Sequence, residues 1–189
     1  MIAGVDYGSK LSGNTALAFF DASNAKVLTC PAKKDADQWL MDQFHQLQIK
    51  KVFIDAPLSL PGVYTGNGEN YHYRKADIEL KAMSPMFLGG LTARAMQLKS
   101  YAEKSKILLI ETYPAATLQR LKNVHLYQKK GVPDVLLWEE ISQLLEASIH
   151  AEQKRGHEFD ACLALYAGHL YENGKANVAG DEVEGMIVY

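Results

Sequence analysis

The sequence has little cysteine, no excess of positive charge and no long apolar run. Its two cysteines, Cys30 and Cys162, lie in different predicted elements without metal-type spacing, so we expect neither a disulfide framework nor a zinc site. Lys and Arg number 20 against 22 Asp and Glu, a net charge of −2, which argues against a dedicated non-specific duplex binder but not against a nuclease. No run approaches the ~20 apolar residues of a transmembrane helix.

What the sequence does contain is an ordinary globular composition. Apolar residues make up 48% of its 189 residues, which excludes intrinsic disorder and allows a sizeable core. The length is typical of one domain, so we expect residues 1–189 to form a single domain. Asp6 interrupts the first apolar residues too early for a secretory signal, and we therefore expect a cytoplasmic protein. The oligomeric state stays open, a homodimer included.

Apolar patterning and turn residues predict an α/β protein. Three short strands open the chain as an antiparallel meander, and a loop rich in Pro, Gly and Tyr spans residues 57–73. The predicted strands are residues 2–7, 14–20, 26–30, 51–55, 106–112 and 185–189, and the predicted helices are residues 35–48, 75–83, 93–103, 114–121, 135–150 and 157–171.

Three of the predicted strands end in a carboxylate. The apolar runs before Asp6, Asp55 and Glu111 are typical of parallel strands buried on both faces, and ligands bind beyond the carboxyl ends of such strands. If the strands run parallel, the three acids converge. Like charges beside buried backbone are costly unless a cation neutralises them, and a divalent metal ion is the simplest one. The pattern therefore predicts a metal site.

A fourth acid, Asp160, lies in the first turn of the last predicted helix. Ala161, Ala164 and Gly168 follow at helical spacing, so this helix can approach the sheet closely while Asp160 leans toward the site. Taken singly, these acids are explained as well by turns and helix caps. The set of four makes a shared cation the better explanation. His157 could cap this helix or lie near the metal, but it stays outside the metal set, because a lone His with no regular partner is more often structural.

Five short motifs carry a resemblance to a known family. GVDYGSK at residues 4–10 resembles the first-strand motif of RNase-H-like nucleases, which include the Holliday-junction resolvases and their relatives. The other four, IDAPLSLP at 54–61, YRKAD at 73–77, IETYP at 110–114 and EFDA at 158–161, are together similar to an uncharacterised family of predicted RNase-H-like nucleases. The resemblance spans nearly the whole chain.

The resemblance implies an RNase-H-like α/β fold, a central mixed β-sheet of an antiparallel meander plus parallel strands, flanked by helices. It also implies a metal-dependent nuclease that uses two Mg²⁺ or Mn²⁺ ions to hydrolyse a phosphodiester. Asp6 would bridge the ions, and Asp55 and Asp160 would hold one each. Glu111 would complete a shell or orient the water, and its late strand carries no acid in many better-known nucleases.

Candidate contacts to substrate phosphates are basic residues in loops. Lys10 lies in the first turn, Arg74 follows the Gly-rich loop, and Lys129-Lys130 lies in a later loop. Each has a plainer explanation, since surface lysines are usually solvated, and Arg74 and Asp77 stand at helical spacing and would also pair with each other. Similarly, the loop tyrosines Tyr64, Tyr71 and Tyr73 either stack on unpaired bases or pack the loop.

Two other functions fit parts of the sequence. The turn after Asp6 also resembles the phosphate-binding turn of actin-like ATP-binding and phosphotransfer domains, although such proteins enclose ATP between two domains and 189 residues supply one. A non-catalytic module that binds nucleic acid or a protein partner would keep the fold without the chemistry. All four acids are present, which favours the nuclease.

Overall fold

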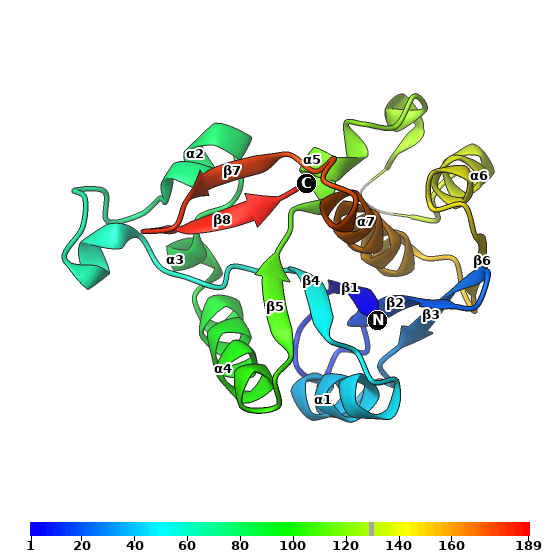
Figure 1. Ribbon diagram of the computed structural model, residues 1–189, viewed down its shortest axis with the longest axis horizontal. Helices are drawn as coiled ribbons and strands as arrows, with labels where there is room; N and C mark the ends of the chain where they lie inside the picture. The colour runs from blue at the N-terminus through cyan, green and yellow to red at the C-terminus, as the bar shows by residue number, and fades with distance from the viewer. Residues whose placement is uncertain (129–130) are drawn as a thin grey trace.

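The computed structural model describes residues 1–128 and 131–189. Its centre is a six-stranded sheet with the strand order β5-β4-β1-β2-β3-β6 (Figure 1). A separate two-stranded sheet pairs β7 with β8. The strands are β1 (Ile2–Asp6), β2 (Ala16–Asp21), β3 (Asn24–Thr29), β4 (Lys51–Asp55), β5 (Leu108–Glu111), β6 (Ser148–Ala151), β7 (Val178–Asp181) and β8 (Gly185–Val188).

The pairing of the strands is RNase-H-like and confirms the predicted fold class. β1, β2 and β3 form an antiparallel meander, β4 and β5 extend the sheet parallel to β1, and β6 pairs in parallel with β3. The helices are α1 (Ala36–Gln46), α2 (Lys75–Leu80), α3 (Pro85–Leu88), α4 (Gly90–Lys104), α5 (Pro114–Leu118), α6 (Val135–Leu144) and α7 (Gly156–Glu172), with 3-10 turns η1 (Gly62–Thr65) and η2 (Val124–Leu126).

Helices cover both faces of the central sheet. In Figure 1, α7 lies on one face, and α1 and α4 lie on the other. Side chains of each strand alternate between the two faces, so Val5 and Leu17 pack toward α1 and α4, whereas Ala16 and Ala18 pack toward α7. This explains why the central strands are apolar almost throughout.

The structure corrects one predicted element and adds one helix and one strand that the sequence did not predict. The helix expected over residues 135–150 ends at Leu144, and Glu146 then turns the chain with a φ of 52° in the left-handed region. The residues that follow form β6, because they extend the sheet at the free edge of β3. The two added elements are the short helix α3 and strand β7, which forms only by pairing with β8. The other predicted elements are present, with ends displaced by a few residues.

The close approach of α7 to β1 depends on Gly4. A Cβ added to Gly4 would lie 2.1 Å from the backbone nitrogen of Leu165 and 2.4 Å from the backbone oxygen of Ala161. Backbone atoms of a packed helix cannot move out of the way as the end of a side chain can. The absence of a side chain at Gly4 therefore allows the short distance between α7 and the sheet. That distance in turn places Asp160 beside the strands.

We expect Gly4→Ala to lower the free energy of unfolding by about 1–3 kcal/mol or more, because α7 must be pushed off the sheet. Urea denaturation followed by circular dichroism measures the change. Gly90→Ala is the matched control, since an added Cβ there meets nothing within 4 Å. Equal stability of the two variants would contradict the close approach.

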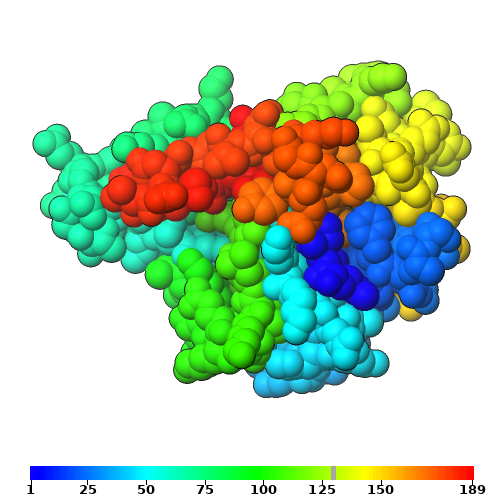
Figure 2. Space-filling model, in the orientation of Figure 1, coloured from blue at the N-terminus to red at the C-terminus, as the bar shows by residue number. Residues whose placement is uncertain are grey.

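The β7-β8 hairpin fastens a lobe formed by the loop after β4 and helix α2. Glu184, in the hairpin, accepts hydrogen bonds from the backbone nitrogens of Gly62 (3.0 Å) and Lys75 (2.9 Å). The Ser59 hydroxyl donates to the backbone oxygen of Glu184. In Figure 2, the red and orange atoms of the hairpin accordingly lie against the teal atoms of this lobe.

Two expectations concern the cysteines and the membrane. Cys30 and Cys162 are both buried and carry free thiols, as predicted. Among residues 1–128 and 131–189, none of the helices has the length and apolar character needed to cross a bilayer.

Candidate functional site

Asp6 and Asp55 lie side by side at the carboxyl ends of neighbouring strands. β1 and β4 run parallel, and Asp6 is the register partner of Asp55. Residues paired in this way point to the same face of a sheet. That face is the one covered by α7, because Val5 and Ile54, one residue earlier on each strand, pack on the α1 and α4 side. The structure thus brings the first two predicted acids together.

Glu111 follows the opposite pattern. Its register partner on β4 is Ile54, not Asp55, so a shift of one residue directs Glu111 toward the α4 face of the sheet. Leu109, two residues earlier on β5, also packs on that face. The third predicted acid therefore ends its strand at the same edge as Asp6 and Asp55, but its side chain is directed to the other side.

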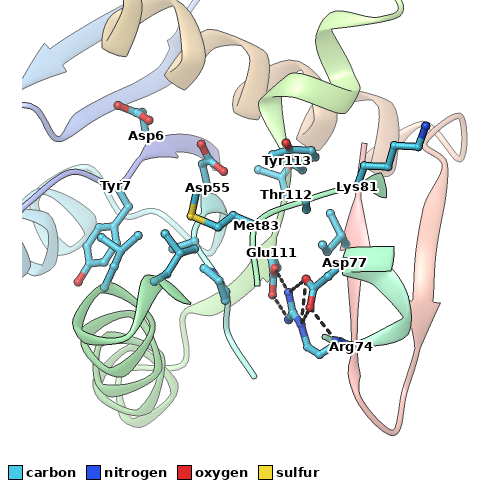
Figure 3. Close-up of a pocket in the computed structure, with 16 residues that line it drawn as sticks. Asp6, Tyr7, Asp55, Arg74, Asp77, Lys81, Met83, Glu111, Thr112 and Tyr113 are labelled. Atoms are coloured by element: carbon cyan, nitrogen blue, oxygen red, sulfur yellow. Dashed lines mark hydrogen bonds and ion pairs between the residues drawn. The ribbon is translucent and has the colours of Figure 1, made fainter. Parts of the chain in front are cut away.

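The carboxylate of Glu111 forms an ion pair with a buried arginine. Arg74 donates from Nη2 to Glu111 Oε1 at 2.6 Å and from Nη1 to Oε2 at 2.7 Å, while the backbone nitrogen of Leu58 donates to Oε2 at 2.9 Å. Arg74 also pairs with Asp77 at 2.7 Å. Figure 3 shows these three charged side chains joined by hydrogen bonds, apart from Asp6 and Asp55.

Burial sets the electrostatics of this cluster. Arg74 and Asp77 are almost completely buried. Desolvation raises the pKa of Glu111, and the hydrogen bonds and charge of Arg74 oppose that rise. A buried arginine with every donor group facing carboxylates or Ser59 has no surface to offer a substrate phosphate. Arg74, Asp77 and Glu111 thus line the same hollow as Asp6 and Asp55, but their charged groups are paired with one another.

His157 is the principal contact of Asp6. Its Nδ1 lies 2.6 Å from Asp6 Oδ2. Burial raises the pKa of Asp6, and the hydrogen bond and charge of His157 act in the opposite direction; the same hydrogen bond raises the pKa of His157. The sequence reasoning that assigned His157 a structural role missed this contact. The signal was present, because His157 precedes Asp160 by three residues and so shares its helix face.

Asp160 reaches the same region from α7. The Tyr127 hydroxyl lies 3.0 Å from Asp160 Oδ1 and 3.2 Å from Oδ2. Burial and the neighbouring Asp160 charge both raise the pKa of Tyr127, so the phenol stays protonated and acts as the donor. Tyr127 is a second residue that the sequence did not single out, since nothing in the pattern around it indicates its contact with α7.

Two hollows meet at Asp6 and Asp55. One has a volume of about 460 Å³ and is also lined by Lys81, Met83 and Tyr113. The other, of about 630 Å³, is also lined by Asn14, Arg155, His157 and Asp160. Because the two acids line both, the carboxylates stand in the middle of a longer depression in the surface. Figure 3 shows Asp6 and Asp55 in the first hollow.

The donor set suits a divalent cation in kind. Asp6, Asp55 and Asp160 supply hard carboxylate oxygens around one hollow, which are the ligands Mg²⁺ and Mn²⁺ prefer. Within the described ranges, no three His, Cys, Asp or Glu side chains converge closely enough to hold one ion as they stand. Ion binding would require Asp6 to turn from His157 and Asp160 from Tyr127, both of which are side-chain movements.

Arg94 fixes the turn that follows Asp6. From α4, it donates to the backbone oxygen of Gly8 at 3.1 Å and pairs with Asp37 of α1 at 2.6 Å. Its guanidinium also lies over the ring of Tyr7, 4.7 Å from the ring centroid. The backbone on either side of Asp6 is therefore held both by β1 and by the two helices beneath the sheet.

The predicted phosphate contacts have other partners in the structure. Arg74 and Asp77 pair with each other and with Glu111, as described above. Lys10 Nζ lies 3.0 Å from Asp35 Oδ2, and in the described part of the chain Lys10 lines neither hollow. Lys129-Lys130 falls outside the described residues. Besides Arg74, whose guanidinium is held by carboxylates, the basic residues that line the hollows are Lys81 in the first and Arg155 in the second.

Comparison with models of known protein families gives no match, and comparison with curated proteins gives none either. The likeness that the structure establishes is one of fold, a mixed α/β sheet with the RNase-H-like strand arrangement. A fold of this kind carries many unrelated activities, so function has to be argued from the side chains of the site.

Proposed function

We propose that this protein is a nuclease that hydrolyses phosphodiester bonds with Mg²⁺ or Mn²⁺. The observation that carries the proposal is the in-register pair Asp6 and Asp55, set at the point where two hollows meet and facing the helix that bears Asp160. Three carboxylates around one surface depression repel one another, and a divalent cation would offset their negative charge.

Asp6, Asp55 and Asp160 are the residues that would hold the ions. Bound there, the ions would activate water as a nucleophile and offset the negative charge of the phosphodiester. His157 and Tyr127 hold Asp6 and Asp160 at the hollow in the absence of metal, and both carboxylates would turn from these contacts to bind an ion. Such contacts from outside the ligand set commonly tune metal sites.

Glu111 takes a different role in this proposal. Its carboxylate accepts hydrogen bonds from Arg74 and from the backbone nitrogen of Leu58, which lies at the start of the loop after Asp55. Through Leu58 it fixes the path of the chain as it leaves β4. We assign Glu111 as a positioning residue for Asp55 instead of a metal ligand.

The shape and charge of the depression suit a polymeric substrate. The hollows extend to both sides of Asp6 and Asp55, with Lys81 in one and Arg155 in the other. A strand laid across the acids would present a phosphate to a cation on each side of the bond to be cut. A small phosphodiester would use only the centre of this arrangement.

Calorimetric titration with Mn²⁺ tests the metal site without a choice of substrate. We expect stoichiometric binding to the wild type, and binding lost or at least halved in Asp6→Asn and in Asp55→Asn, because each variant removes one charged ligand. Asp42→Asn is the matched control, since Asp42 is an exposed acid on α1. It should bind as the wild type does.

Two results would contradict the assignment. Binding that survives both variants would place the ion elsewhere. If neither Mn²⁺ binding nor Mn²⁺-dependent cleavage of DNA or RNA occurs in the wild type, the depression belongs to a non-catalytic binding module.

A further inference from the structure

A group of aromatic side chains lies on the surface beyond the acids. Phe87 of α3 is 64% exposed. The His72 ring stacks on it with centroids 5.9 Å apart and an interplanar angle of 28°, and the Tyr73 ring meets its edge at 5.9 Å. We call Phe87, His72 and Tyr73 the aromatic surface. None of the three has a role in the site described above.

The aromatic surface is held in place by polar contacts beneath it. The buried Ser84 hydroxyl donates to the backbone oxygen of His72 and accepts from the backbone nitrogen of Met86 at 3.0 Å, which caps α3. Asn70 Oδ1 accepts from the backbone nitrogens of His72 and Tyr73, both at 2.9 Å. The rings are thus presented to solvent on an ordered support.

The segment that carries Phe87 also contributes to the hollow that contains Asp6 and Asp55. Lys81, Met83 and Leu88 line that hollow; Leu88 follows Phe87 directly, and Met83 precedes it by four residues. Met83 is itself 59% exposed. Figure 3 shows Met83 and Lys81 in the hollow with Asp55. Two apolar side chains of this segment and the cation Lys81 therefore lie in the hollow of the acids, and one of the two apolar residues adjoins Phe87 along the chain.

We propose that the aromatic surface stacks an unpaired base of the nucleic-acid strand whose phosphodiester is positioned at Asp6 and Asp55. The inference rests on the proposed function and specifies its substrate as a strand with unpaired nucleotides. Ring faces of aromatic side chains bind bases of any sequence by stacking, and a cation nearby contacts the adjoining phosphate. A base inside a duplex has no free face to offer.

The size of the aromatic surface favours a base over a protein partner. A fully exposed aromatic side chain offers about 150–250 Å², and these three rings are exposed only in part. A stable protein interface buries about 800 Å² on each partner. One or two bases match the available area, whereas a second copy of the chain would need much more than the rings provide.

Fluorescence anisotropy with labelled single-stranded DNA, in the presence of EDTA, tests the inference. We expect the wild type to bind an intact strand more tightly than a strand of equal length with abasic positions, and Phe87→Ala to weaken binding of the intact strand about tenfold. Binding of the abasic strand should not change. Phe87→Tyr, which keeps an aromatic ring, is the matched control and should bind normally. An RNA strand is measured in parallel, and stacking on either polymer supports the inference.

Three results would overturn it. The first is that the wild type binds intact and abasic strands with equal affinity, or binds neither strand. The second is that Phe87→Ala binds the intact strand as tightly as the wild type does. The third is self-association that sedimentation shows to be lost in Phe87→Ala, which would assign the aromatic surface to contacts between copies. EDTA removes metal and prevents cleavage, so binding and cleavage are measured separately. Stacking without metal-dependent cleavage would refute the proposed function alone. Cleavage without base-dependent binding would refute this inference alone.

Discussion

Asp6→Asn is expected to lower metal-dependent cleavage by at least about 10³-fold, which corresponds to ~4 kcal/mol of lost transition-state stabilisation. The side chain keeps its size, so the loss would come from the missing negative charge. Asp6 is the one acid that lies next to Asp55 in register and also contacts α7 through His157. Single-turnover cleavage of a labelled strand with Mn²⁺ measures the effect, and Asp42→Asn again serves as control.

The same variant should not be less stable than the wild type. Burial raises the pKa of Asp6, which means that the folded state disfavours the ionised carboxylate. At pH values above the ordinary pKa of an aspartate, ionisation of Asp6 therefore lowers the free energy of unfolding. We therefore expect Asp6→Asn to unfold at an equal or higher temperature without metal. Added Mn²⁺ should stabilise the wild type by mass action and leave the variant unchanged.

Two outcomes would speak against this account. A loss of activity accompanied by a large fall in unfolding temperature would mean that Asp6 supports the fold. Activity within about tenfold of the wild type would mean that Asp6 is not a ligand, since one lost ligand charge should cost several kcal/mol.

Of the variants considered, Arg74→Met is expected to lower the free energy of unfolding most, by about 3–5 kcal/mol. Removing one partner from a buried ionic cluster leaves uncompensated charge, and here the arginine is the partner of two buried acids, Glu111 and Asp77. For a chain of this length the melting temperature should fall by roughly 10 °C. Arg74→Lys should be intermediate, because a single ammonium cannot donate to both acids in the paired geometry of a guanidinium.

The pH dependence of this loss has a predictable sign. The pKa of Glu111 is already raised by burial, and Arg74 is what limits the rise. Without Arg74 the pKa rises further, so the stability deficit of Arg74→Met should grow as the pH increases above the ordinary range of a glutamate. Arg74→Met combined with Glu111→Gln should recover part of the loss. A deficit below about 1 kcal/mol, or one independent of pH, would contradict the cluster's role.

The sequence predicted the strand ends well because apolar runs and turn residues are local signals. Asp6, Asp55 and Glu111 each end a strand as expected. The face to which each acid points depends on register, which is a property of strand pairs. One residue of offset between β4 and β5 separates Glu111 from the other two, and nothing in the sequence of either strand specifies that offset.

The hydrogen-bond partners of the acids could not be predicted from the sequence either. Arg74 meets Glu111 across 37 positions of the chain, and Tyr127 meets Asp160 across 33. Such contacts arise only once the loops are folded back onto the sheet. Strand β6 was missed for the same reason, since its residues continue the apolar pattern of α6 and become a strand only by joining β3.

The packing of α7 on β1 has a consequence for synthesis in the cell. Gly4 lies against Ala161 and Leu165, which the ribosome adds more than 150 residues later. At roughly 5–20 residues per second, the nascent meander waits about 8–30 seconds with its α7 face uncovered. That face then closes in the same event that delivers Asp160 and His157 to Asp6, so the three acids of the proposed metal site come together only after nearly the whole chain has been made.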